Sequence, residues 1–319
     1  MIYRIVLAFT FLALIACSKN NEDPLTFNKV DPRVIYGNDD RVDLYDVTDP
    51  EWFDVAQSTV SIFDQKKLVD EGTHFKISST VFGTTYGLCQ DEPFFSQPIS
   101  AFCSGSLIGP DLIVTAGHCI RNEYNCEKAR FVFGYSYTTQ NTDPTVIDKS
   151  DVYSCKEIIH SETNAVTGSD FALIRLDRKV LNHPVLPIQS DQLIADDQSL
   201  VVIGHPSGLP VKLAGNGKIR DNSQESFFVT NLDTYGGNSG SPVFNSSTKE
   251  IEGILVRGES DFIYDIDKQC RRSNKCDNDS CRGEDVVRIS SILEHISASD
   301  LDPLPLRLPA TLLIPPIVY

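Results

Sequence analysis

Short runs of apolar and β-branched residues recur along most of this 319-residue chain, and turn-forming residues separate them. Each run has the length of a strand, and Gly, Pro, Asn and Asp stand between the runs. The runs are Thr59–Phe63, Ser106–Thr115, Arg130–Tyr137, Ser154–His160, Phe171–Leu176, Leu200–Gly204, Ser226–Leu232, Pro242–Phe244, Ile251–Val256 and Asp285–Ile289. Helical spacing is rare, and its clearest case is Ser290–Ile296. The pattern predicts an all-β sandwich or barrel with a short C-terminal helix.

The N-terminus has the pattern of a targeting signal. Arg4 precedes an apolar run, Ile5–Ala16, which is too short to span a bilayer comfortably and is typical of a signal peptide rather than a buried helix. The run ends Leu14-Ile15-Ala16-Cys17, which resembles a bacterial lipobox and implies cleavage before Cys17 and lipidation of that cysteine. We therefore expect residues 1–16 to be a lipoprotein-type signal peptide and the polar residues 17–33 to be a spacer or pro-segment.

Composition agrees with export. Without Cys17, eight of the nine cysteines remain, and an even number in an exported chain indicates disulfides. The net charge of −16 leaves no basic patch for nucleic acid. No segment after residue 16 is apolar enough to cross a membrane, so we expect membrane contact only through the lipid. Residues 260–284 predict a disulfide-tied loop, and the Pro- and Leu-rich tail, 299–319, either lies extended across the barrel or binds a partner.

Three segments carry groups that act together in covalent catalysis. A hydroxyl is a poor nucleophile at neutral pH and needs a neutral imidazole to take its proton and a carboxylate to orient that imidazole. His118, Asp170 and Ser239 supply these groups, far enough apart in the sequence to sit on different loops. In chain order the segments read TAGHC (Thr115–Cys119), SDFALIRL (Ser169–Leu176) and GGNSGSP (Gly236–Pro242).

These segments, in this order, resemble the trypsin/chymotrypsin superfamily of serine proteases, and within it the bacterial glutamyl-endopeptidase-like branch. The resemblance implies two six-stranded antiparallel β-barrels over residues 34–298, with the catalytic cleft between them. It implies a serine endopeptidase in which His118 is the general base, Asp170 orients it and Ser239 is the nucleophile. The N–H groups of Gly237 and Ser239 are expected to form the oxyanion hole.

The family also implies a disulfide between Cys103 and Cys119, beside the base histidine. Cys126–Cys155 is a second candidate pair, and the pairing of the other four cysteines stays open. Cys276 and Cys281 are expected in disulfides rather than at zinc. The remaining histidines share no metal-binding spacing, so we expect them in packing or surface roles and expect no metal and no cofactor; they are His74, His160, His183, His205 and His295.

Specificity is less determined. In the superfamily, residues before the nucleophile and a later strand line the specificity pocket, which makes Asp233, Thr234, Leu255 and Arg257 the candidate substrate-binding residues. Asp233 stands where trypsin-like members bind Arg or Lys, whereas Leu255 replaces a histidine of the glutamyl members. Arg257 either pairs with Asp233 and cancels its negative charge, or faces a substrate carboxylate. Our hypothesis is a preference for basic residues, with a broad or acidic preference as the alternative.

Processing is expected between Arg33 and Val34, because the sequence from Val34 resembles the mature N-terminus of glutamyl-endopeptidase-like enzymes. Asn238 precedes the nucleophile and has no charge to pair with a new α-ammonium, so the usual trypsinogen switch is not expected. The expected partners are protein or peptide substrates of a monomer that is secreted or held in the bacterial cell envelope. The alternatives are a catalytically inactive surface binding protein on the same fold, and an acyl hydrolase on another fold, which the chain order His, Asp, Ser disfavours.

Overall fold

The computed structural model describes residues 35–189 and 193–301. The predicted signal peptide, the spacer, Arg33, Val34 and residues 302–319 of the tail lie outside the described residues. Among the described residues, no helix has both the length and the apolar character to cross a membrane.

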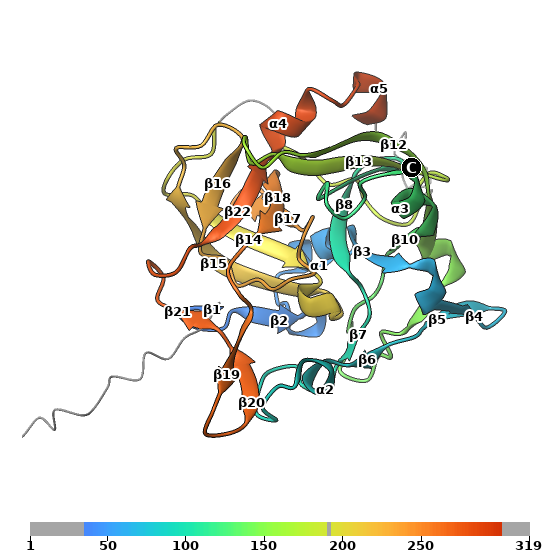
Figure 1. Ribbon diagram of the computed structural model, residues 1–319. Helices are drawn as coiled ribbons and strands as arrows, with labels where there is room; N and C mark the ends of the chain where they lie inside the picture. The colour runs from blue at the N-terminus through green and yellow to red at the C-terminus, as the bar shows by residue number, and fades with distance from the viewer. Residues whose placement is uncertain (1–34, 190–192, 302–319) are drawn as a thin grey trace, which may run out of the picture. The chain divides into compact units, whose positions relative to one another are not determined.

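Six antiparallel strands close into the first barrel, in the order β10-β12-β13-β9-β8-β3 (Figure 1). The strands are β3 (Thr59–Asp64), β8 (Cys103–Gly109), β9 (Leu112–Thr115), β10 (Ala129–Val132), β12 (Val152–Thr163) and β13 (Asp170–Leu176). Every residue of β8 is buried, and six of the seven in β13 are buried as well.

A second ring runs β14-β17-β18-β22-β16-β15 and closes through the pairing of β14 with β15. Its strands are β14 (Ser199–Gly204), β15 (Lys212–Asp221), β16 (Phe227–Thr230), β17 (Pro242–Asn245), β18 (Ile251–Arg257) and β22 (Glu284–Arg288), with β2 (Arg41–Asp43) added on the outer side of β15. The predicted fold of two six-stranded antiparallel barrels is confirmed.

Smaller pairings surround the barrels. They are β1 (Ile35–Tyr36) with β21 (Lys275–Cys276), β4 (Leu68–Asp70) with β5 (His74–Ile77) and β11 (Val146–Asp148), β6 (Thr80–Val81) with β7 (Pro98–Ile99), and β19 (Phe262–Asp265) with β20 (Cys270–Ser273). The helices are short: α1 (Pro50–Ala56), α2 (Phe82–Tyr86), α3 (Glu123–Lys128), α4 (Ile289–Leu293) and α5 (Ala298–Leu301). Helix α4 overlaps the predicted helix Ser290–Ile296.

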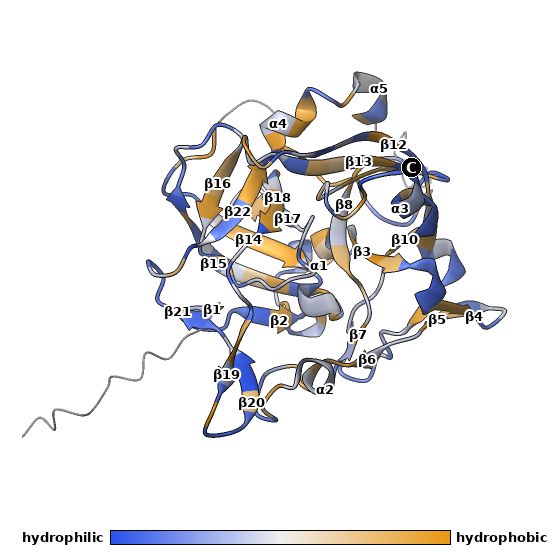
Figure 2. Cartoon of the chain, viewed as in Figure 1, coloured by the Kyte–Doolittle hydropathy of each residue, from blue (hydrophilic) through white to orange (hydrophobic). Residues whose placement is uncertain are grey.

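Apolar side chains fill both barrels. In Figure 2, barrel strands such as β14 are coloured as hydrophobic, whereas the hairpin β19–β20 is largely hydrophilic. Phe131 and Phe171 in the first barrel and Phe228 and Phe244 in the second are at most 1% exposed. Burying one such side chain contributes about 1.5–3 kcal/mol. This packing holds the loops between strands in place.

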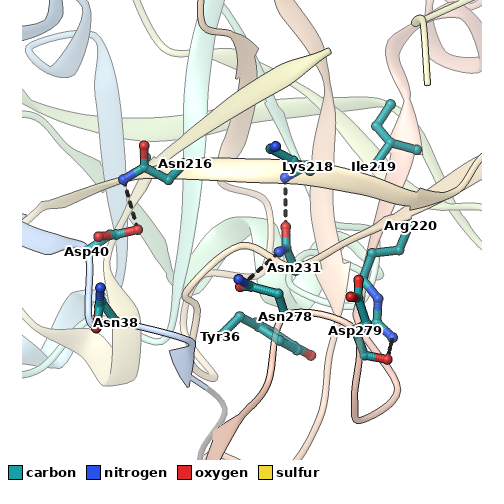
Figure 3. Close-up of a pocket in the computed structure, with 11 residues that line it drawn as sticks. Tyr36, Asn38, Asp40, Asn216, Lys218, Ile219, Arg220, Asn231, Asn278 and Asp279 are labelled. Carbon is teal, nitrogen blue, oxygen red and sulfur yellow. Dashed lines mark hydrogen bonds between the residues drawn. The ribbon is translucent and has the colours of Figure 1, made fainter. Parts of the chain in front are cut away.

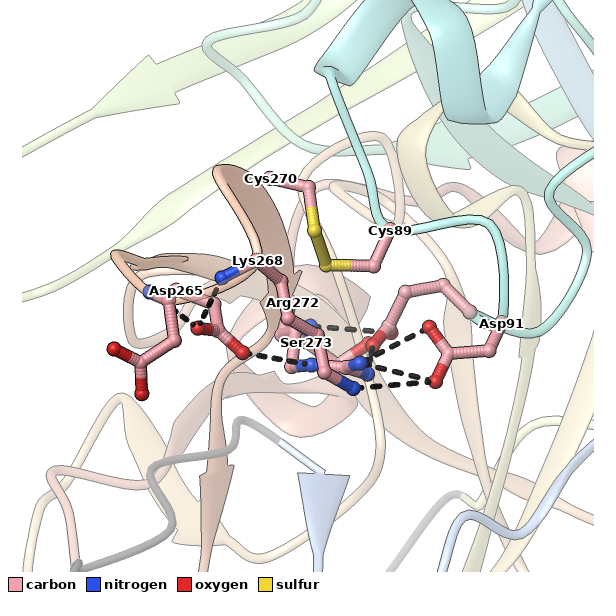
Figure 4. The surroundings of a disulfide bond; sticks show 9 residues. Cys89, Asp91, Asp265, Lys268, Cys270, Arg272 and Ser273 are labelled. Carbon is pink, nitrogen blue, oxygen red and sulfur yellow. Dashed lines mark hydrogen bonds and ion pairs between the residues drawn. A yellow bond between two sulfur atoms is a disulfide. The ribbon is translucent and has the colours of Figure 1, made fainter.

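Four disulfides link the chain: Cys89–Cys270, Cys103–Cys119, Cys126–Cys155 and Cys276–Cys281. The first spans 181 residues and ties the hairpin β19–β20 to the loop after α2 (Figure 4). Beside it, Arg272 on β20 contacts Asp91 and Glu92, each at 3.0 Å. Residues 260–284 are therefore a cross-linked hairpin followed by a small Cys276–Cys281 loop.

Candidate active site

Paired strands bring His118 and Asp170 together. His118 follows β9, Asp170 begins β13, and β9 pairs with β13. Asp170 Oδ1 accepts from the His118 backbone N–H at 2.9 Å, and Asp170 Oδ2 lies 2.8 Å from His118 Nδ1. The carboxylate side chain is 4% exposed, whereas the imidazole is 27% exposed. With Nδ1–H donated to the carboxylate, Nε2 is left to accept a proton.

Ser239 lies on the loop before β17, against the same end of the first barrel. Its backbone carbonyl accepts from the Ser104 N–H at 2.9 Å and lies 3.7 Å from Cys119 Sγ, next to His118 in the chain. Within the described residues, Ser239 Oγ makes no hydrogen bond with His118 Nε2. Such bonds are often long before substrate binds.

Backbone contacts hold the loop before Ser239 in one conformation. Gly237 has φ +92°, and a Cβ there would lie 2.7 Å from the carbonyl oxygen of His205. The Gly236 carbonyl accepts from Ser207 N–H at 2.5 Å, and the Gly237 carbonyl accepts from Ser104 Oγ at 2.9 Å. Over residues 35–189 and 193–301, the N–H groups of Gly237 and Ser239 have no hydrogen-bond partner. Two donors are therefore free to bind an oxyanion.

A pocket of about 110 Å³ opens beside Ser239. The sequence-derived candidates Thr234, Leu255 and Arg257 line it, and Asp233 does not. The remaining lining residues are Tyr235, Gly236, Val256, Gly258, Glu259, Asp261 and Glu284. Strands β18 and β22, which pair with each other, supply Leu255, Val256, Arg257 and Glu284 to the lining.

Asp233 faces residues 36–40, called here the N-terminal segment, instead of the pocket. Its carboxylate accepts from the Tyr36 N–H at 2.7 Å and from the Asp40 N–H at 2.8 Å, and the residue is 3% exposed. Burial raises the pKa of Asp233 to about 7. The position of Asp233 in the sequence does not determine the direction in which its side chain points. The Asp233 carboxylate, which was expected to bind substrate, therefore already accepts hydrogen bonds from the backbone amides of residues 36 and 40.

Three carboxylates line the pocket, on Glu259, Asp261 and Glu284, and none of them was expected from the sequence. Glu284, at the start of β22, accepts from Thr234 Oγ1 at 2.5 Å and is 2% exposed. Asp261 accepts from the Gly236 N–H at 2.9 Å. Burial raises the pKa of Glu284 to about 8 and that of Asp261 to about 6. Their pKa values rise because the pocket provides too little positive charge to offset the loss of hydration.

Arg257 is the one basic residue in the pocket lining. Its Nε donates to Asp285 Oδ2 at 3.0 Å and its NH2 donates to the Gly168 carbonyl at 2.8 Å. Its NH1 lies 3.9 Å from Asp170 Oδ2. Arg257 thus pairs with Asp285 and approaches the His118–Asp170 pair. Among the described residues it makes no contact with Asp233, the carboxylate whose charge it was expected to cancel in one of the two alternatives.

A larger pocket, of about 750 Å³, lies between the N-terminal segment and β15 (Figure 3). Its polar side chains bond to one another, as Asn216 does with Asp40 at 3.0 Å and Asn231 with Asn278 at 3.3 Å. The lining contains no serine, cysteine or histidine. The smaller pocket beside Ser239 is therefore the better candidate for a catalytic site. Cys103, His118 and Cys119 also lie close together, but the cysteines form a disulfide and cannot bind a metal as thiolates.

Comparison with known proteins agrees with this geometry. Residues 103–254 match the family model described as the trypsin-like peptidase domain, which covers His118, Asp170 and Ser239. Residues 103–254 are therefore similar to a trypsin-like peptidase domain. Over 82 residues it is 33% identical to snake venom serine protease 1 of Craspedocephalus gramineus and to snake venom serine protease PA of Trimeresurus stejnegeri. These matches span 25% of the chain and 29% of each relative.

Two solved structures are also similar to the chain. A Glu endopeptidase in complex with MPD has 14% identity and a TM-score of 0.48, covering 84% of this chain and 100% of that one. The VesB protease of Vibrio cholerae has 13% identity and a TM-score of 0.49, covering 82% of this chain and 66% of that one.

Proposed function

We propose that this protein is a serine endopeptidase that hydrolyses peptide bonds through an acyl-enzyme on Ser239. The observation that carries the proposal is the His118–Asp170 pair beside Ser239, with two free N–H groups on the nucleophile loop. His118 Nε2 takes the Ser239 hydroxyl proton as Oγ attacks the scissile carbonyl, and then donates it to the leaving amine. Water repeats these steps to release the acyl group.

The amides of Gly237 and Ser239 stabilise the oxyanion of each tetrahedral intermediate. The contacts from Ser104 and Ser207 fix the neighbouring carbonyls, so the loop need not reorganise as charge develops. In this mechanism Asp170 holds the imidazole in the reactive tautomer and stabilises the imidazolium that forms.

The preferred residue before the scissile bond is Lys or Arg. Three carboxylates line the pocket, on Glu259, Asp261 and Glu284, whereas its one cation, Arg257, is paired with Asp285. A cationic side chain would supply the missing positive charge, and an acidic one would add a further negative charge. The preference expected from the sequence is kept, but we assign it to Glu284 and Asp261 rather than Asp233.

A set of peptides that differ only in the residue before the scissile bond tests both the proposed endopeptidase activity and the proposed preference for Lys or Arg. The purified protein should cleave after Lys or Arg, and the Ser239→Ala variant should cleave none of the peptides. Faster cleavage after Glu than after Arg would contradict the assigned preference. Complete inactivity of a protein that also resists fluorophosphonate labelling would favour the alternative, a catalytically inactive protease-like surface binding protein.

The location and maturation of the enzyme follow from its N-terminal sequence. We propose that the protein is exported and either held at the bacterial cell envelope by lipidated Cys17 or secreted after cleavage between Arg33 and Val34, and that it acts as a monomer on protein or peptide substrates. An enzyme that prefers Arg could make this cut itself. Sequencing the N-terminus of the wild-type and Ser239→Ala proteins tests this, because self-cleavage predicts Val34 as the first residue of the wild type alone.

A further inference from the structure

A cluster of metal-binding side chains lies outside the site described above. It consists of His160 and Glu162 on β12 and His295 just after α4, beside β12 and β13 in Figure 1. One donor atom from each residue lies within 4.8 Å of the other two. The histidines are far apart in the sequence, which explains why no metal spacing is visible there.

The polar groups of this cluster are incompletely paired. Among the described residues, His160 Nε2 is buried and has no hydrogen-bond partner, and its distance to Glu162 Oε2 is 3.7 Å. A buried ring nitrogen without a partner loses its hydration without compensation. His295 Nε2 lies 3.3 Å from Glu294 Oε1, which brings a second carboxylate to the edge of the cluster.

We propose that this cluster binds Zn²⁺. Two imidazoles and one carboxylate form a common set of protein ligands for zinc, with the fourth position open to water, and imidazole favours zinc over Ca²⁺ or Mg²⁺. Tetrahedral coordination at bond lengths of about 2.0–2.2 Å places donor atoms about 3.3 Å apart. The cluster therefore needs to contract by about 1.5 Å at most.

The two histidine rings stack with centroids 3.8 Å apart and planes at 20°, so one ring must turn before both nitrogens face a common ion. The two rings are about equally exposed and both contact Phe171, but His160 lies within strand β12, whereas His295 follows the short helix α4. His295 is therefore the ring that turns. Binding replaces the stacking contact with a metal bond and gives His160 Nε2 a partner.

The site adjoins the proposed catalytic pair. In the β12–β13 pairing, Glu162 lies opposite Phe171 and Thr163 opposite Asp170, and the Glu162 backbone carbonyl packs directly on Gly117, the neighbour of His118. A metal that draws Glu162 toward His295 displaces strand β12, which contacts the backbone next to His118 and the residue Asp170. We expect bound Zn²⁺ to slow hydrolysis at least about fivefold, the lower end of typical coupling between sites. This consequence, unlike the binding itself, rests on the proposed function.

Zinc binding is measured on the full chain carrying Ser239→Ala, by calorimetric titration with zinc chloride at neutral pH after treatment with EDTA. We expect one Zn²⁺ per chain. Adding His160→Phe or His295→Phe keeps an aromatic ring in the stack but should weaken binding at least about tenfold. The matched control His74→Gln, on β5, should bind zinc as the parent does. Unchanged binding in both Phe variants would place zinc elsewhere, for example at His118, and would overturn the proposal, as would no binding at all.

Inhibition is measured on the wild-type enzyme with a fluorogenic peptide, as the ratio of rates in zinc and in EDTA. The ratio should fall at least about fivefold for the wild type and for His74→Gln, and should stay near one for His295→Phe. Zinc that binds at the cluster without changing the wild-type ratio would refute the coupling to catalysis. Because binding is read in a protein without the nucleophile, its result stands whether or not the chain is a peptidase.

Discussion

Replacing Glu284 by Gln tests which carboxylate selects the substrate. The variant keeps the size of the side chain and an oxygen for Thr234 Oγ1, but removes the charge. A substrate cation about 4 Å from this carboxylate gains about 4 kcal/mol at an effective dielectric constant of 20. The pKa of Glu284 is raised to about 8, so ionising it at neutral pH costs about 1.4 kcal/mol of that gain. About 2–3 kcal/mol remain, which is about 30- to 150-fold in kcat/KM.

The assay compares kcat/KM for two peptides that carry Arg or Gln before the scissile bond. Active enzyme is counted with a fluorophosphonate titrant, so that misfolded protein does not enter the comparison. Glu284→Gln should lower the Arg/Gln ratio about 30- to 150-fold. Asp233→Asn is the matched control: it removes a charge of the same kind from a carboxylate that faces Tyr36 and Asp40, and it should leave the ratio nearly unchanged. A ratio that collapses in Asp233→Asn and survives in Glu284→Gln would refute the reasoning.

Three further results are expected. Burial raises the pKa of Glu284 from 4.5 to about 8, so between these pH values the native state binds more protons than the unfolded chain. The stability that this group contributes is therefore present at low pH and lost as the pH rises toward 8. In urea unfolding from pH about 6.5 to 8, the free energy of unfolding should decline less steeply in Glu284→Gln than in the wild type. Asp43 and Lys212 form a buried ion pair at 2.6 Å, so Asp43→Asn should lower the free energy of unfolding by about 3–5 kcal/mol, and equal stability in urea would contradict this. Gly237→Ala places a Cβ 2.7 Å from the carbonyl oxygen of His205, which should displace the backbone N–H of residue 237. We expect kcat to fall about 10²- to 10³-fold with little change in the circular dichroism spectrum. An unchanged kcat would show that Gly237 is not part of the oxyanion hole.

The fold and the pairing of His118 with Asp170 could be predicted because each depends on short segments. The alternation of apolar runs and turns indicates strands from local residue preferences, and TAGHC and GGNSGSP carry their reacting residue within a few positions of the features that present it. His118 lies just after β9, Asp170 begins β13, and the pairing of these strands brings the two residues together. No knowledge of distant side-chain packing is needed for that step.

The lining of the pocket beside Ser239 could not be predicted in the same way, because it depends on where distant side chains point. Glu284 is brought to Thr234 by the position of β22 between β16 and β18, and nothing near residue 284 marks it as part of a pocket. Asp233 was identified by its distance from Ser239, yet its direction is set by amides of the N-terminal segment. The contact between His160 and His295 likewise depends on how the residues that follow α4 pack against β12.

Covalent labelling of Ser239 tests the central claim most directly. The wild-type protein is treated with a fluorophosphonate probe and the modified peptide is identified by mass spectrometry, with Ser239→Ala, His118→Ala and the heat-denatured wild type as controls. An activated serine in a working triad should be labelled at Ser239 in the native wild type and in none of the controls. Labelling that is absent from the native wild type, or that persists in His118→Ala at the wild-type rate, would contradict the account.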